Sequence, residues 1–147
     1  MKEASEKNPI LELLIRTDPE KTAELEGEGR RVRMIPFSGT AAGPLFQGVI
    51  APGAVDTQIT NAAEVRHMSA RYMLTGRDHT GWPCHIFVQN DGWFTDGARP
   101  RPWHSVPTFL TDSPTLAPVL HRNCFIGEGL RDAEGLHIRF YETAAGR

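Results

Sequence analysis

The sequence has few of the features that cross-link a protein. Only two of its 147 residues are cysteines, Cys84 and Cys124, and each lies within an apolar, strand-like segment. Disulfides are typical of oxidising compartments, so we expect two buried free thiols. A chain of this length can fold as one domain without such staples. We therefore predict a single domain over residues 1–147, with a disordered tail at residues 1–9.

Long apolar runs are also missing. The longest, Ile10 to Ile15, is interrupted by Glu12, and residues 1–9 are charged rather than apolar. A membrane-spanning helix needs about 20 apolar residues, and a secretory signal needs an apolar core, so neither is predicted. We expect a soluble, cytoplasmic protein with no membrane partner.

No strong excess of either charge is present. Sixteen Lys and Arg against eighteen Asp and Glu give a formal net charge of -2, which leaves little positive charge for phosphates, and no nucleic-acid partner is expected. The one locally basic segment, residues 30–33, is typical of a solvated edge strand.

Several motifs of known chemistry are lacking too. The six histidines are scattered with no His-x-His pair, and the two cysteines are too far apart in sequence for a zinc site built from close cysteine pairs. Neither a glycine-rich phosphate loop nor a Gly-x-Ser-x-Gly elbow occurs. We therefore predict no metal and no cofactor.

What the sequence does contain is a series of short segments with period-two alternation, separated by glycine, proline or aspartate. A loose, proline-containing segment covers residues 93–118, and helical turns are plausible near Pro19 and at Ser113-Pro114. Turns are expected at 39–44 and 76–81, and at Asn90-Asp91-Gly92. Strands are predicted at residues 10–15, 32–37, 45–50, 54–59, 65–75, 84–88, 120–126 and 136–142.

This pattern predicts an all-β fold. About eight or more strands without a long amphipathic helix favour a sandwich or a barrel. We prefer a single antiparallel up-and-down barrel of the calycin type, because closure removes exposed edges and Gly48 would let a strand bend. A barrel of about eight strands encloses either packed side chains or one small ligand.

Several strings, in this order and spacing, resemble the bacterial and fungal family numbered 3237 among the domains of unknown function. The resemblance spans roughly residues 9–142 and implies one antiparallel β-barrel. Two positions depart from the family pattern: Thr57 stands where a tryptophan is expected, and His121 where an asparagine is expected. The matching strings are FQGVIAPGAVDTQ (46–58), SARY (69–72), IFVQNDG (86–92), FIGEG (125–129) and FYE (140–142).

Asp56 is the leading candidate for a general base. In a strand its side chain shares a face with Gln58, and a carboxylate among apolar residues is either paired or shifted in pKa. It could instead be a turn-flanking aspartate. Arg71 and Tyr72 are adjacent, so only one of them enters the lumen: Tyr72 would supply a phenol, and Arg71 would hold an anion or neutralise Asp56. We favour Tyr72.

His121 is a second acid–base candidate, on a face shared with Asn123, although a lone strand histidine is more often simply half exposed. Asn90 could orient a substrate or form an ordinary hairpin turn. Three aromatic residues in or near the loose segment could cover the pocket or form a subunit contact, namely Trp93, Trp103 and Phe109.

These residues lead to three hypotheses. The first is a cofactor-independent enzyme that moves a proton on a small, partly apolar, oxygenated molecule, as an isomerase, hydratase, lyase or cyclase would. The second is a calycin-like carrier of a hydrophobic molecule. The third is a filled barrel that acts only in assembly, which a lumen without a cavity of roughly 300 Å³ would favour. A small-molecule partner is expected, and a homodimer is left open.

Overall fold

The computed structural model describes residues 8–95, 100 and 102–143, so most of the predicted tail lies outside the described residues. Strands dominate the described chain, as predicted. They are β1 (Leu11–Thr17), β2 (Ala23–Gly27), β3 (Arg30–Ala42), β4 (Phe46–Ile50), β5 (Val55–Thr60), β6 (Arg66–Asp78), β7 (Pro83–Phe94), β8 (Trp103–Thr111), β9 (Phe125–Asp132) and β10 (Gly135–Glu142). The helical elements among these residues are the 3-10 turn η1 (Pro19–Lys21) and the short α2 (Ala117–Leu120).

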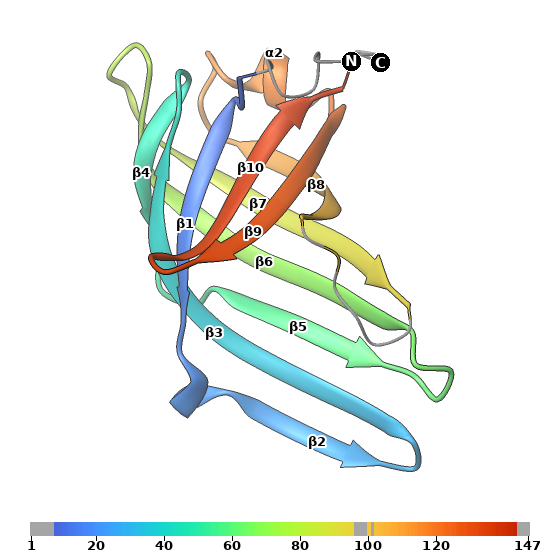
Figure 1. Ribbon diagram of the computed structural model, residues 1–147. Helices are drawn as coiled ribbons and strands as arrows, with labels where there is room; N and C mark the ends of the chain where they lie inside the picture. The colour runs from blue at the N-terminus through green and yellow to red at the C-terminus, as the bar shows by residue number, and fades with distance from the viewer. Residues whose placement is uncertain (1–7, 96–99, 101, 144–147) are drawn as a thin grey trace.

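The strands form a closed antiparallel barrel, which confirms the predicted fold class. Neighbours run β1, β10, β9, β8, β7, β6, β4, β3, and β1 closes the ring by pairing with β3 as well as β10. Strands β4 and β5 share one place in the wall, since both pair with β3 and β6. Eight strands therefore make the cylinder, and β2 extends it beyond the β3 edge (Figure 1).

Period-two alternation determines which side chains fill the interior. Strand β8 shows it clearly: Trp103, Ser105 and Phe109 are buried, and each is followed by an exposed residue. The large interior side chains include Leu13, Phe46, Leu74, Ile86, Phe125 and Phe140. Cys84 and Cys124 are buried free thiols, as predicted.

Two glycines let strands β4 and β6 approach closely. A Cβ on Gly48 would lie 2.2 Å from the carbonyl oxygen of Thr75, and one on Gly76 would lie 2.0 Å from that of Gln47. Neither position can carry a side chain unless the backbone moves. The bend expected at Gly48 stays a prediction, whereas Gly76, expected to begin a turn, lies inside β6.

The two ends of the barrel differ. At the upper end of Figure 1 lies α2, and both Leu120 of this helix and Leu116 directly before it are buried. At the lower end, β2, β5 and the nearby part of β3 spread away from the cylinder (Figure 1). The strands therefore stay close together at the upper end and separate at the lower end.

Several local predictions were wrong. Residues 120–124 form the end of α2 and a turn, so the strand there begins only at Phe125. The loose segment contains strand β8, the predicted Asn90 turn lies inside β7, and residues 39–42 continue β3. Strand β2 was missed because its glutamates made the segment resemble a polar connection, and all its residues are indeed exposed. Within the described ranges, no helix is long and apolar enough to cross a membrane.

Candidate active site

A small cavity lies inside the barrel at its lower end. Its volume is about 30 Å³, room for one or two water molecules by the usual ~10–15 Å³ minimum per water. Apolar side chains make up most of the wall, among them Ile15, Phe37 and Met68. The polar residues that line this lower cavity are Thr17, Asp56, Tyr72 and Asn90.

Strand β5 brings Asp56 and Gln58 to the interior face. Asp56 pairs in register with Ile35 on one side and Ala70 on the other, both buried. Gln58 is itself buried, and its Nε2 donates a hydrogen bond of 2.9 Å to Asp56 Oδ2. The amide therefore fixes the orientation of the carboxylate at the cavity wall.

Of the adjacent pair on β6, Tyr72 faces the interior and Arg71 is exposed. The phenol ring of Tyr72 packs edge-on against Phe37, with ring centroids 5.2 Å apart. Burial, together with the negative charge of Asp56, raises the pKa of Tyr72 far above its ordinary value. Its hydroxyl consequently keeps its proton and can act as a hydrogen-bond donor beside Asp56.

Two further buried polar groups face the interior without a hydrogen-bond partner among the described residues. They are Asn90 Oδ1 on β7 and Ser105 Oγ on β8, and both side chains are nearly inaccessible to solvent. Ser105 lies opposite Gly127, where an added Cβ would meet its Oγ at 2.4 Å. An unsatisfied buried group costs about 1–3 kcal/mol, so these oxygens are suited to a partner that enters the barrel.

The three aromatic residues predicted to cover the pocket lie in three different places. Trp103 lines the lower cavity and packs edge-on against Phe94, with ring centroids 5.9 Å apart. Phe109 belongs to the apolar core between two other phenylalanines. Trp93 is 66% exposed on the outer wall, where its ring stacks on that of His67 with ring centroids 4.0 Å apart.

His121 and Asn123 do not reach the cavity. Both are exposed in the turn that follows α2, and Asn123 has a positive φ of 50°. His121 Nε2 accepts a hydrogen bond from the Thr111 amide, and Asn123 Oδ1 accepts one from the Phe109 amide. Residues 120–124 are not a strand, so these two side chains do not point into the barrel. Their hydrogen bonds instead attach the turn after α2 to strand β8.

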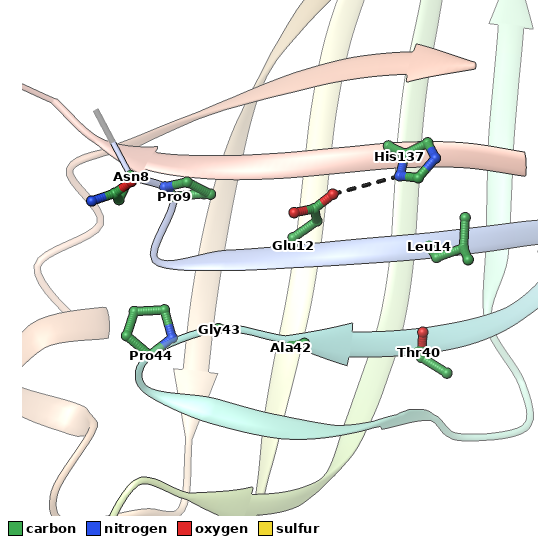
Figure 2. Close-up of a pocket in the computed structure, with 9 residues that line it drawn as sticks. All are labelled: Asn8, Pro9, Glu12, Leu14, Thr40, Ala42, Gly43, Pro44 and His137. Atoms are coloured by element: carbon green, nitrogen blue, oxygen red, sulfur yellow. Dashed lines mark ion pairs between the residues drawn. The ribbon is translucent and has the colours of Figure 1, made fainter. Parts of the chain in front are cut away.

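Besides a groove of about 400 Å³ over β6, β7 and β8, two outer grooves are larger than the interior cavity but more open. One, of about 410 Å³, lies over β5 and β6 and includes His67 and Arg71. The other, of about 620 Å³, runs over the outer face of β1 and β3 to β10 (Figure 2). Its acidic and imidazole side chains are Glu12 and His137, whose carboxylate oxygen and Nδ1 atom are 3.5 Å apart. Exposed strand faces form most of this second groove.

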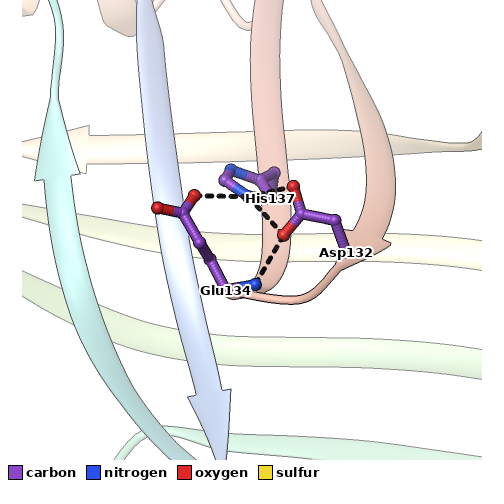
Figure 3. Close-up of side chains that lie close together, drawn as sticks. All are labelled: Asp132, Glu134 and His137. Carbon is purple, nitrogen blue, oxygen red and sulfur yellow. Dashed lines mark hydrogen bonds and ion pairs between the residues drawn. The ribbon is translucent and has the colours of Figure 1, made fainter.

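A cluster of possible metal ligands lies at the turn between β9 and β10 (Figure 3). One ligand atom each from Asp132, Glu134 and His137 lies within 4.8 Å of the others. Sequence spacing gave no signal of this cluster, since the three residues meet only when the hairpin folds. Asp132 already accepts hydrogen bonds from the Glu134 amide and from His137, so the cluster also stabilises its own turn.

The fold and the lower cavity define an antiparallel β-barrel with a small, partly polar interior site. The chain belongs to the family described as a protein of unknown function (DUF3237), whose family model matches residues 6–143. A UPF0311 protein of Clostridium acetobutylicum is similar, with 26% identity over 130 residues and 79% of each chain covered.

Solved structures show the same fold. A protein of unknown function from Clostridium acetobutylicum aligns over 92% of this chain and 94% of its own, with 26% identity and a TM-score of 0.74. A β-barrel-like protein from Acinetobacter baumannii covers 93% and 94%, with 19% identity and a TM-score of 0.70. A protein from Penicillium herquei, described as an enzyme, covers 92% of each chain at 14% identity and a TM-score of 0.63.

Proposed function

We propose that the chain is a cofactor-independent enzyme that moves a proton on a small, partly apolar, oxygenated molecule in the lower cavity. The observation that carries the proposal is that Asp56 and Tyr72 border the same cavity. One is a carboxylate and the other is a phenol whose raised pKa keeps it protonated. Neighbouring groups with opposed protonation states are the usual basis of acid–base catalysis near neutral pH.

Each polar residue then has a distinct task. Asp56 removes a proton from a carbon beside a carbonyl, and Tyr72 donates a hydrogen bond to the oxygen on which negative charge develops. Gln58 holds the carboxylate through its 2.9 Å hydrogen bond. Asn90 Oδ1 accepts a hydrogen bond from a hydroxyl of the substrate. Isomerisation, elimination and cyclisation can begin with such a step, and hydration of an unsaturated carbonyl compound ends with its reverse, the return of a proton to the carbon beside the carbonyl.

The small volume of the cavity favours a second candidate, the filled barrel that serves only in assembly. A typical ligand site occupies about 300–1,000 Å³, far more than the 30 Å³ present. The unsatisfied oxygens of Asn90 and Ser105 argue for the enzyme, because a purely structural core gains nothing from them. Entry of a substrate requires side chains at the lower end to move aside.

The fold of the Penicillium herquei protein, which is described as an enzyme, agrees with this proposal. At 14% identity the agreement concerns the fold alone. The specific reaction class, the cytoplasmic location, the small-molecule partner and the homodimer stay predictions.

Proton transfer can be tested without knowing the final product. The protein is incubated in D2O with a panel of small ketones, lactones and hydroxy acids, and NMR measures deuterium incorporation at the carbons beside each carbonyl. We expect catalysed exchange in at least one compound, reduced about a hundredfold or more by Asp56→Asn, since general-base catalysis typically contributes ~10²–10⁴. Tyr72→Phe should reduce it about a hundredfold as well.

Matched controls exist for both variants. Asp91→Asn changes an aspartate on β7 next to Asn90 that faces outward, and Tyr141→Phe changes the other tyrosine, on β10. Both should exchange at the wild-type rate. Equal rates in wild type and Asp56→Asn would refute the enzyme proposal, and binding without exchange would favour the carrier.

A further inference from the structure

Arginine side chains gather on the interior face at the lower end of the barrel. Arg33 pairs in register with Gln58, and Gln58 pairs with Met68, so all three share the interior face. Arg66 lies two residues before Met68 on β6 and faces the same way. Positive charge therefore lies next to the lower cavity, on the side where Gln58 and Met68 follow Asp56 and Ala70 along the sheet.

Arg66 has no salt-bridge partner within the part of the chain that the structure describes. Its guanidinium carbon lies 5.4 Å from the centroid of the Phe94 ring, and its Nε is buried with no hydrogen-bond acceptor among those residues. A guanidinium is a rigid fork of donors that matches a carboxylate with two parallel hydrogen bonds. Its buried Nε thus faces the interior with an unused bonding direction.

Arg33 is only partly compensated. Its Nε lies 3.7 Å from Glu24 Oε2, too far for a hydrogen bond, and the same oxygen accepts a 3.1 Å bond from Arg31. One carboxylate therefore serves two arginines, and Arg33 Nε has no hydrogen-bond acceptor among the described residues. A second anion would complete the coordination of this arginine.

We propose that the substrate carries a carboxylate, held at the lower end by Arg66 and Arg33. This inference rests on the proposed function and names the substrate class for the same site. The acid enters with its carboxylate toward the arginines, and its carbonyl-bearing part reaches Asp56 and Tyr72. Phe94 and Trp103, in edge-on contact beside Arg66, offer an apolar surface that suits an aromatic or unsaturated acid.

The sheet register sets the length of this acid. Asp56 pairs with Ile35 and Ala70, so Arg33 lies two residues further along β3 and Arg66 four residues further along β6. At about 3.3 Å per residue, the arginine backbones are roughly 7 Å and 13 Å from the level of Asp56. Because arginine side chains are long, a molecule with one ring between its carboxylate and its reactive carbon spans the gap.

Phenylacetate and the neutral phenylacetamide are the probes, because they differ in charge and little in shape. Titration of the protein with each is followed through the NMR signals of the arginine Nε–H groups. We expect phenylacetate to shift the signals of Arg66 and Arg33, and phenylacetamide to bind at least about tenfold more weakly. Arg66→Gln should weaken phenylacetate binding by a similar factor, and Arg66→Lys should restore only part of it.

The matched control is Arg77→Gln, which changes an exposed, outward-facing arginine on the same strand and should bind phenylacetate as wild type does. Circular dichroism and thermal melting establish that each variant is folded. Equal affinity for the two probes, unchanged binding by Arg66→Gln, or no shift at the highest soluble phenylacetate concentration would overturn the carboxylate site. Asp56→Asn should bind phenylacetate as wild type does, because the carboxylate is held by the arginines. Binding therefore tests the carboxylate site, and deuterium exchange tests the catalytic role of Asp56 separately.

Discussion

At the upper end of the barrel the buried carboxylate of Asp78 accepts hydrogen bonds from Thr80, Trp82 and Ser113, whereas at the lower end Asn90 Oδ1 accepts none from any described residue. Both groups are almost completely buried. The upper network ties the β6–β7 turn to the segment before α2, and Ser113 Oγ also accepts the Leu116 amide. The upper end therefore has its buried polar atoms satisfied, as in a region that stabilises the fold, whereas the lower end has buried polar atoms that are left to bind a ligand.

The largest expected effect is a loss of stability on truncating a side chain of the apolar core toward the upper end of the barrel. Phe109→Ala should lower the free energy of unfolding by about 3–5 kcal/mol, because Phe109 is 1% exposed and its removal leaves a cavity between Phe125 and Phe140. Urea denaturation measures the change. Leu110→Ala, at the next, exposed position, should change it by less than about 0.5 kcal/mol. Similar losses in both variants would contradict a structural role specific to Phe109.

A second prediction concerns acid stability at the upper end. The pKa of Asp78 is lowered to about 2, chiefly by the hydrogen bond from the Thr80 hydroxyl. Because this folded-state pKa lies below the unfolded value, the stabilisation is complete above about pH 4 and is lost as the pH falls toward 2. The stability difference between wild type and Asp78→Asn, measured by urea denaturation, should therefore shrink over that range. A difference that stays constant would rule out this role for Asp78.

The smallest expected effect has the opposite sign and lies at the lower end. Ser105→Ala should raise the free energy of unfolding by up to about 1 kcal/mol, since it deletes a buried hydroxyl that has no partner in the described residues. The control Ser69→Ala, on the outer wall, removes a hydrogen bond to Asp91 and should lower stability. Destabilisation by Ser105→Ala would erase the distinction between the two ends.

Period-two alternation and turn residues were sufficient to predict the barrel, and the shared face of Asp56 and Gln58 was visible for the same reason. Strand β8 was hidden because prolines 102 and 107 suggested a loop, although Pro107 fits the wall as a buried residue opposite Asn90. Asn90-Asp91-Gly92 has the composition of a hairpin turn, yet strand β7 continues through it to Phe94. Pairing with β6 along the whole strand overrides the local preference for a turn.

The parts of the site that sequence could not supply depend on register. Arg66 and Ser105 face the interior only because β6 and β8 begin where they do, and a shift by one residue would reverse both. His121 is predicted to be an acid–base group because residues 120–126 resemble a strand, but the backbone turns at Asn123 before β9 begins. Sequence alone also leaves the cavity volume open, since it depends on how all interior side chains pack.

The pairing of β1 with β10 joins residues 11–15 to residues 136–140. During synthesis, the first strand must wait for the last before the cylinder can close, so a growing chain exposes two unpaired strand edges until then. Proteins dominated by such distant contacts fold slowly, commonly in milliseconds to seconds. The interval before ring closure is consequently when this protein is most open to aggregation or to chaperone binding.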